Sequence, residues 1–233
     1  MRERKIVDKF HRLYFDAHKR GETWMNTFWM GVMVEKYPQD LWIYQEIIYE
    51  TRPDVIVETG TFYGGSALFL ASICELIDSG KVITIDTHDL ESIEVEYTLA
   101  SRAMKGAEGR PPHKRITYLR GSSISEEILK RVKQLIKPKD RVMVILDSDH
   151  EKNHVLNELR IYSELVTKGG YLRVEDTCLN GNPVMPEFGP GPKEAVEEFL
   201  RENSDFIADK NIEKFYITAN PGGYLRKTLF PLA

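Results

Sequence analysis

Residues 54–66 read Asp-Val-Ile-Val-Glu-Thr-Gly-Thr-Phe-Tyr-Gly-Gly-Ser, and this stretch decides the fold class. A short apolar run follows Arg52-Pro53 and leads through a glycine-rich turn into a helical pattern at residues 64–77. Strand, turn and helix in this order form the repeating unit of parallel α/β sheets. Glycines in the turn let bare backbone approach a ligand, and the first helical turn offers free N–H groups. The stretch therefore predicts an α/β fold with a ligand-binding turn.

The rest of the chain continues this pattern with apolar runs that alternate with helices. The runs lie at residues 82–85, 116–119, 142–146 and 171–174. Continuous apolar strands indicate a sheet that is covered on both faces. We expect residues 214–218 and 224–229 to form an antiparallel hairpin around Asn220-Pro221-Gly222-Gly223 that ends the sheet. The prediction is a doubly wound, mostly parallel, seven-stranded sheet of the Rossmann-like type.

The N-terminal fifty residues differ from the rest in being rich in aromatic and methionine side chains, such as Phe10, Trp24 and Met33. Their mostly helical spacing predicts two or three helices. We expect residues 1–50 to form a helical extension that covers one end of the sheet, ahead of a domain at residues 51–233. An oligomer contact, giving a homo-oligomer, or a wall of the substrate site is the alternative use of these side chains.

Composition limits the classes of partner and compartment. With 32 Lys and Arg against 36 Asp and Glu, the net charge is −4, which argues against a general nucleic-acid or anionic-membrane binder. Cys74 and Cys178 have no metal-ligand spacing, so we expect reduced thiols. No apolar run approaches the length of a membrane span and no signal peptide is evident, so we expect a cytoplasmic protein.

Acidic or small polar residues stand where each predicted strand ends. Ligands of open α/β sheets bind outside the carboxyl ends of the strands. The carboxylate of Asp86 could accept hydrogen bonds from both hydroxyls of a ribose, and Ser122 could meet the edge of a base. In strand order the set is Glu58, Asp86, Gly121-Ser122-Ser123, Asp147 and Glu175-Asp176.

Glu58 bears on the choice of cofactor, because it replaces the first glycine of a dinucleotide-binding loop. An acid there would face the like charge of a pyrophosphate, which argues against an NAD(P)-dependent oxidoreductase. It suits a cationic cofactor with a free amino group, and S-adenosylmethionine is such a molecule.

Asp147, Glu175 and Asp176 offer three hard oxygen ligands, a set that suits Mg²⁺ or Mn²⁺. His150 lies three residues after Asp147 and could act as a general base, the alternative being a surface histidine at a helix start. His150-Glu151-Lys152-Asn153-His154 also matches the H-E-x-x-H motif of zinc peptidases. That motif needs the middle of a helix, and here it directly follows a predicted strand.

Several motifs resemble a known family. Residues 58–66 are similar to the first motif of catechol-type, metal-dependent O-methyltransferases. Val174-Glu175-Asp176-Thr177, with residues 186–192 and 194–200, more closely resembles the cephalosporin hydroxylase/rhamnosyl O-methyltransferase family, from about Leu41 to the C-terminus. The third metal ligand of the catechol-type enzymes is typically an amide, so Asp176 agrees better with the closer family.

The resemblance implies a role for each candidate site residue. Glu58 and Gly60 would border the methionine part of S-adenosylmethionine, Asp86 its ribose and Ser122 its adenine. Asp147, Glu175 and Asp176 would hold the divalent cation, and His150 would stand near the attacking hydroxyl. Tyr63, Gly64 and Ser66 complete the predicted cofactor-binding turn.

The resulting hypothesis is methyl transfer from S-adenosylmethionine to a hydroxyl of a sugar or natural-product small molecule, with one divalent cation. Residues 178–193 contain three glycines and four prolines and predict a substrate lid, or else a rigid loop. A non-catalytic cofactor-binding partner in a hydroxylation or methoxylation complex is the other open alternative.

Overall fold

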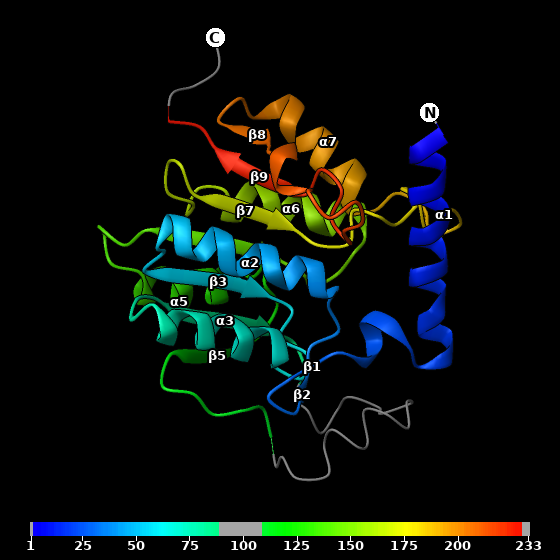
Figure 1. The fold of residues 1–233 in the computed structure, drawn as a ribbon. Helices are drawn as coiled ribbons and strands as arrows, with labels where there is room; N and C mark the ends of the chain where they lie inside the picture. The colour runs from blue at the N-terminus through cyan, green and yellow to red at the C-terminus, as the bar shows by residue number, and fades with distance from the viewer. Residues whose placement is uncertain (1, 89–108, 230–233) are drawn as a thin grey trace.

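A computed structural model describes residues 2–88 and 109–229 of the chain (Figure 1). The helices are α1 (Arg2–Asp16), α2 (Pro38–Thr51), α3 (Gly65–Leu76), α5 (Glu126–Leu135), α6 (Lys152–Tyr162) and α7 (Pro192–Glu202). The strands are β1 (Phe28–Trp29), β2 (Val32–Met33), β3 (Val55–Thr59), β4 (Lys81–Asp86), β5 (Ile116–Arg120), β6 (Val142–Leu146), β7 (Tyr171–Val174), β8 (Phe206–Ala208) and β9 (Tyr224–Lys227). The 3-10 helices are η1 (Ala17–Arg20), η2 (Thr23–Asn26) and η4 (Lys210–Ile212).

Seven strands form one sheet in the order β5-β4-β3-β6-β7-β9-β8, and β1 pairs with β2 separately. Neighbours from β5 to β7 run parallel, whereas β9 is antiparallel to both β7 and β8. The chain winds outward from β3 in one direction through β4 and β5, and in the other through β6 and β7. The switch therefore lies between β3 and β6, and ligands of such sheets bind there. The predicted doubly wound, mostly parallel sheet is confirmed.

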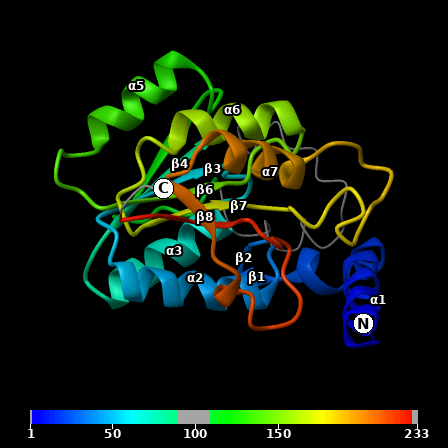
Figure 2. The same ribbon diagram turned by 90° about the horizontal axis from the view of Figure 1, so that it is seen from above.

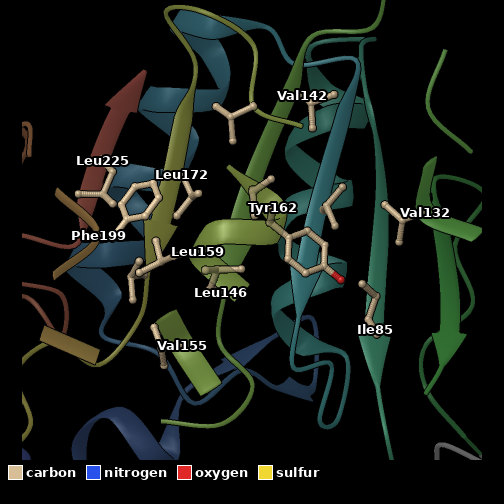
Figure 3. Packing of buried hydrophobic residues seen from close by; sticks show 14 of the residues in the cluster. Ile85, Val132, Val142, Leu146, Val155, Leu159, Tyr162, Leu172, Phe199 and Leu225 are labelled. Atoms are coloured by element: carbon tan, nitrogen blue, oxygen red, sulfur yellow. The ribbon is translucent and has the colours of Figure 1, made fainter. Parts of the chain in front are cut away.

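Helices cover both faces of the sheet, with α2 and α3 on one side and α5, α6 and α7 on the other (Figure 2). Val55 and Val57 of β3 join the apolar cluster beneath α5, α6 and α7, whereas Ile56 joins the cluster beneath α2 and α3. Figure 3 shows part of the first cluster, where Leu159 and Phe199 belong to the helical layer. A strand buried on both faces must be apolar at successive positions, which explains the continuous run in the sequence.

The predicted C-terminal hairpin is wrong in its first strand. Residues 214–218 are not a strand; β9 pairs instead with β8 at residues 206–208. The reason lies in a tertiary contact at the end of this segment. The Oγ1 of Thr218 and the backbone N–H of Ala219 donate to the buried carboxylate of Asp40, 2.5 and 2.9 Å away. These groups are therefore committed to α2 rather than to a neighbouring strand.

The N-terminal region divides into two parts. α2 packs directly on the sheet through Ile43, Tyr44, Ile47 and Ile48, so part of the predicted extension is a layer of the sheet domain. α1 stands beyond the carboxyl ends of the parallel strands (Figure 1). Phe15 anchors it in a small apolar cluster with residues of the 178–184 and 217–219 segments. Within the described residues, no helix has the length and apolar character that crossing a bilayer requires.

Candidate active site

A cavity of about 530 Å³ opens at the carboxyl ends of β3, β4, β5 and β6. Small-molecule sites typically occupy several hundred cubic ångströms, so this cavity has room for a cofactor. The segment after β2 and the glycine turn after β3 supply part of its wall. Of the residues predicted from the sequence, the cavity lining includes Gly60, Tyr63, Ser66, Asp86, Ser122, Asp147 and His150. Glu58, Gly64, Glu175 and Asp176 lie outside that lining.

Two glycines of the turn are required by close backbone approaches. Gly60 has a φ of +85°, and a Cβ at this position would lie 1.9 Å from the carbonyl oxygen of Asp147. A Cβ on Gly65 would lie 1.9 Å from the carbonyl oxygen of Met33. Both separations are far below any real contact. The turn can therefore press against the β6 end on one side and against β2 on the other only because these residues lack side chains.

Asp86 ends β4 and is held in place by backbone donors. The N–H of Phe62 donates to its Oδ2 at 2.8 Å, and the N–H of His88 donates to its Oδ1 at 2.9 Å. The guanidinium of Arg110 lies 3.2 Å from the same Oδ2. The carboxylate is thus rigidly placed at the cavity wall. Sequence reasoning missed Arg110, which follows a segment without a motif.

Glu58 lies beneath the turn, and its side chain is 1% exposed. Its Oε2 accepts a hydrogen bond from Thr84 Oγ1 at 2.7 Å, and Ser66 is a further hydroxyl partner. Burial raises the pKa of Glu58 from 4.5 to about 7, although the two hydroxyls act in the opposite direction. The residue therefore supports the floor of the turn, and whether it touches the cofactor stays a prediction.

One acid from the end of β6 and one from the end of β7 come together with a histidine. Ligand atoms of Asp147, His150 and Asp176 lie within 4.8 Å of one another, which is compatible with one shared cation. The Nε2 atom of His150 lies 3.2 Å from Asp176 Oδ2. Burial raises the pKa of Asp176. The structure therefore places Asp147, Asp176 and His150 side by side, and the roles predicted for them stay predictions.

Glu175 is directed elsewhere. Its side chain is 1% exposed, and its Oε1 accepts a hydrogen bond from the hydroxyl of Tyr44. The same oxygen lies 3.3 Å from Arg173 Nε and 3.4 Å from Lys36 Nζ. Burial raises the pKa of Glu175 to about 7, against the opposing effect of Lys36. Within the described residues Glu175 is not part of the three-residue cation cluster, so its role as a ligand stays a prediction.

Lys36 is a site residue that sequence reasoning missed. Its ammonium lies 2.5 Å from Asp147 Oδ2, and the side chain is 7% exposed at the cavity wall. Burial alone would lower the pKa of Lys36, but Asp147, Glu175 and Asp176 together raise it above its ordinary value. The cation is therefore held in its charged form among three carboxylates. Nothing in the local pattern around residue 36 signalled this contact.

Arg173 and Asp40 complete a buried network behind the site. The guanidinium of Arg173 lies between the rings of Tyr44 and Tyr224, 3.9 and 4.2 Å from their centroids. It also lies 3.5 Å from Asp40 Oδ1. An arginine inside an apolar strand is rarely buried unless it is paired with an acid. Arg173 in the run 171–174 could therefore have indicated a buried ion pair behind the site. Through Arg173 and Tyr44, this network holds the carboxylate of Glu175 in place.

The backbone at Asp176 is fixed by the C-terminal segment. Its N–H donates to Asn220 Oδ1 at 2.6 Å, and its φ of +57° is unusual for a residue other than glycine. Asn220 is fully buried and is linked in turn to Asp40 at 3.4 Å. The carboxylate of Asp176 is thereby aimed by residues that are far away in the sequence.

The H-E-x-x-H segment does not form a zinc-peptidase site. His150 precedes α6, whereas His154 lies in its first turn and contacts Ser123 and Ser148 rather than the cation cluster. The part of the chain that the structure describes therefore does not bring the two histidines together on one ion. The zinc motif needs both histidines in the middle of one helix, and α6 begins only after His150.

Comparisons with known proteins agree with this architecture. Among solved structures, the chain is similar to the apo structure of CmcI (TM-score 0.63, 20% identity, covering 88% of this chain and 78% of that one). It is also similar to a CmcI structure with Mg and SAM (TM-score 0.61, 20% identity, 88% and 77% coverage). The fold is therefore that of the Rossmann-like methyltransferases.

Sequence comparison is more specific than fold comparison. The family model described as rhamnosyl O-methyltransferase/CmcI matches residues 21–228. The chain is 35% identical over 224 residues to the rhamnosyl O-methyltransferase of Mycobacterium tuberculosis (strain ATCC 25618 / H37Rv), covering 94% of this chain and 84% of that protein. The identity to the rhamnosyl O-methyltransferase of Mycobacterium leprae is 34%, with 94% and 90% coverage. The chain belongs to the rhamnosyl O-methyltransferase/CmcI family, and the resemblance noted in the sequence is confirmed.

Proposed function

We propose that this protein is an S-adenosylmethionine-dependent O-methyltransferase that uses a divalent cation and methylates a hydroxyl of a sugar or natural-product small molecule. The observation that carries the proposal is the convergence of Asp86, Ser122 and Asp147 on one cavity beside the cluster of Asp147, His150 and Asp176. Asp147 belongs both to the cavity wall and to the cation cluster. A metal-assisted methyl transfer requires such closeness, because the cation must hold the acceptor hydroxyl next to the cofactor.

The cavity fits the proposed cofactor along its length. Asp86 offers a fixed carboxylate for a ribose, and Ser122 lies in the lining where a base would end. Gly60 contributes bare backbone to the same cavity wall. When bound, S-adenosylmethionine supplies an electrophilic methyl group on a sulfonium, whose positive charge suits a site rich in carboxylates.

The charges of the site fit a divalent cation. Among the described residues, the carboxylates of Asp40, Asp147 and Glu175 pair with two fixed cations, Lys36 and Arg173. Asp176 pairs with His150 instead. The cluster therefore has an excess of negative charge, which is costly in a buried setting without a counter-ion. Asp147 and Asp176, completed by water, would hold Mg²⁺ or Mn²⁺, which prefer oxygen ligands. The bound ion would lower the pKa of an acceptor hydroxyl.

His150 has the position for a proton-accepting role. It borders the cavity, and its Nε2 is oriented by Asp176 at 3.2 Å. A carboxylate that orients an imidazole next to a reacting hydroxyl is a common arrangement for general bases. We assign to His150 the removal of the proton from the acceptor hydroxyl. Positioning of that hydroxyl by the surrounding side chains is the other main contribution to the rate.

The acceptor class rests on the relatives and on the surroundings of the cavity. The relatives in Mycobacterium are named for a rhamnosyl group, so a sugar hydroxyl is the first acceptor to test. The 178–193 segment is the proposed substrate lid. Its first half is packed by Leu179 and Val184, whereas Met185 and Phe188 are exposed at its tip. We propose that these exposed apolar side chains contact the acceptor.

The test combines binding and transfer. Calorimetry with S-adenosylhomocysteine should show one site, and methyl transfer from labelled S-adenosylmethionine to rhamnosides and other hydroxylated small molecules should require Mg²⁺ or Mn²⁺. Asp147→Ala should abolish transfer and metal dependence while the protein stays folded. Asp149→Ala, in the same loop but outside the cation cluster, is the matched control and should retain metal dependence. Full activity of Asp147→Ala would remove the metal from the mechanism.

A further inference from the structure

A second polar cluster lies in the cavity, apart from the cation site. His154, in the first turn of α6, is 21% exposed and lines the cavity. Its Nε2 atom lies 3.1 Å from Ser148 Oγ, 3.3 Å from Ser123 Oγ and 3.5 Å from Glu158 Oε1. Ser148 follows β6 and Ser123 follows β5, so three separate elements converge on one ring nitrogen.

Glu158 is the unusual member of this cluster, because its side chain is fully buried. Its Oε1 accepts a hydrogen bond from Ser148 Oγ at 2.8 Å, whereas its Oε2 has no hydrogen-bond partner within the described residues. A buried carboxylate with an incomplete set of partners is costly. His154 is the nearby group that can offset this cost, and its hydrogen bond with Glu158 raises the pKa of His154.

The cluster is not a nucleophilic triad. In a triad the hydroxyl and the carboxylate bind opposite nitrogens of the imidazole. Here Ser148, Ser123 and Glu158 all lie next to Nε2. The arrangement therefore immobilises the ring rather than activating a serine. Tyr162 reinforces it, since its hydroxyl donates to the backbone oxygen of Ser123 at 2.7 Å.

This immobilisation determines what the ring can offer to a ligand. With Nε2 engaged from behind, Nδ1 is the ring nitrogen that makes no hydrogen bond in the described part of the chain. The ring borders the same cavity as Gly121, Ser122 and Ser123, the residues that follow β5. That end of the cavity is where the proposed function puts the purine base. An imidazole fixed in this way leaves Nδ1 as the ring nitrogen that can hydrogen-bond to one position of a base.

We propose that the Nδ1–H of His154 donates a hydrogen bond to N1 of the cofactor's adenine, with Glu158 and Ser148 as positioning residues that hold the imidazole through Nε2. The inference rests on the proposed function, because it assumes that the cavity binds S-adenosylmethionine. It assigns a specificity-determining role to a residue outside both the glycine turn and the cation cluster. Changing that edge of the base should therefore weaken binding through His154.

The experiment compares two ligands that differ only at this edge: S-adenosylhomocysteine, whose N1 accepts a hydrogen bond, and S-inosylhomocysteine, in which a carbonyl oxygen replaces the 6-amino group and N1 carries a hydrogen. Wild-type protein should bind the adenine compound about tenfold more tightly, the effect of one well-placed hydrogen bond. His154→Phe should reduce this ratio to within about twofold. Asp86→Asn, at the proposed ribose position, should weaken both ligands and keep the ratio.

The outcomes separate this inference from the proposed function. If wild-type protein binds neither compound, the proposed function fails. If it binds both equally, or if His154→Phe keeps the wild-type ratio, the role of His154 is wrong and the proposed function stands. Circular dichroism checks the fold of each variant, and His154→Gln replaces His154→Phe if the latter unfolds. Glu158→Gln should lower the ratio by freeing the ring, whereas a purely structural role would weaken both ligands alike.

Discussion

The ammonium group of Lys36 lies 2.5 Å from Asp147 Oδ2, although the two residues are 111 positions apart. Lys36 directly precedes the Tyr37 cap of α2, and Asp147 directly follows β6. The N-terminal segment thus contributes a charged group to the centre of the candidate active site. A protein that begins at residue 51 would lack this charge, so the predicted boundary between extension and catalytic domain does not separate the site from the extension.

Lys36→Met tests the electrostatic role of this cation. Lys36 opposes a divalent ion at the same carboxylates, so its removal should lower the melting temperature without metal and tighten Mg²⁺ or Mn²⁺ binding by about tenfold. Calorimetry and thermal melts with and without metal measure both effects. Lys36→Arg retains the charge and is the control. Weaker metal binding in Lys36→Met would show that Lys36 supports the ion instead.

His150→Gln distinguishes a base from a ligand. As the general base, His150 contributes on the order of a hundredfold or more to the rate, so kcat should fall by about that factor. Affinity for S-adenosylhomocysteine and for the metal should change little. A parallel loss of metal affinity in calorimetry would instead assign His150 to the coordination of the ion, as its place in the cluster with Asp147 and Asp176 also allows.

Glu58→Gln should change the pH dependence of stability. The pKa of Glu58 is about 7 in the folded protein, above its ordinary value of 4.5. Its contribution to stability is therefore complete below pH 4.5 and is lost as the pH rises through 7. Glutamine cannot ionise, so the variant should gain about 3 kcal/mol of unfolding free energy over the wild type between pH 4.5 and pH 8.

Urea denaturation at several pH values measures this difference. Glu187→Gln, on the exposed tip of the 178–193 segment, is the control and should follow the wild-type pH profile. An unchanged profile in Glu58→Gln would mean that the Glu58 carboxylate does not carry the cost of burial that its surroundings indicate.

Gly60→Ala should destabilise the protein by more than about 3 kcal/mol, because the new Cβ would collide with the Asp147 backbone. Gly31→Ala is a matched control. Gly31 has a similar φ of +83° but nothing within 4 Å of the added Cβ, so only the conformational cost of about 1 kcal/mol applies. Equal losses in the two variants, measured by chemical denaturation, would show that the approach of the turn to β6 can relax.

Much of the fold could be predicted because its signals are local. Continuous apolar runs mark β4, β5, β6 and β7 to within one residue. The parallel arrangement then brings the carboxyl ends to one edge, so the sequence alone is enough to group Asp86, Asp147 and Asp176. The C-terminal hairpin could not be predicted in the same way, since Thr218 and Ala219, at the end of the predicted first strand, form tertiary hydrogen bonds with Asp40.

The sequence by itself determined the class of fold, the glycine turn and the acids at the strand ends, because strand periodicity and backbone freedom are properties of neighbouring residues. Only the tertiary structure decided how the charges are shared. Lys36 reaches Asp147 and Glu175, and Arg173 draws Glu175 away from the pair formed by Asp176 and His150. Such pairings join residues that are distant in the chain, and burial makes them strong, so no local pattern can specify them.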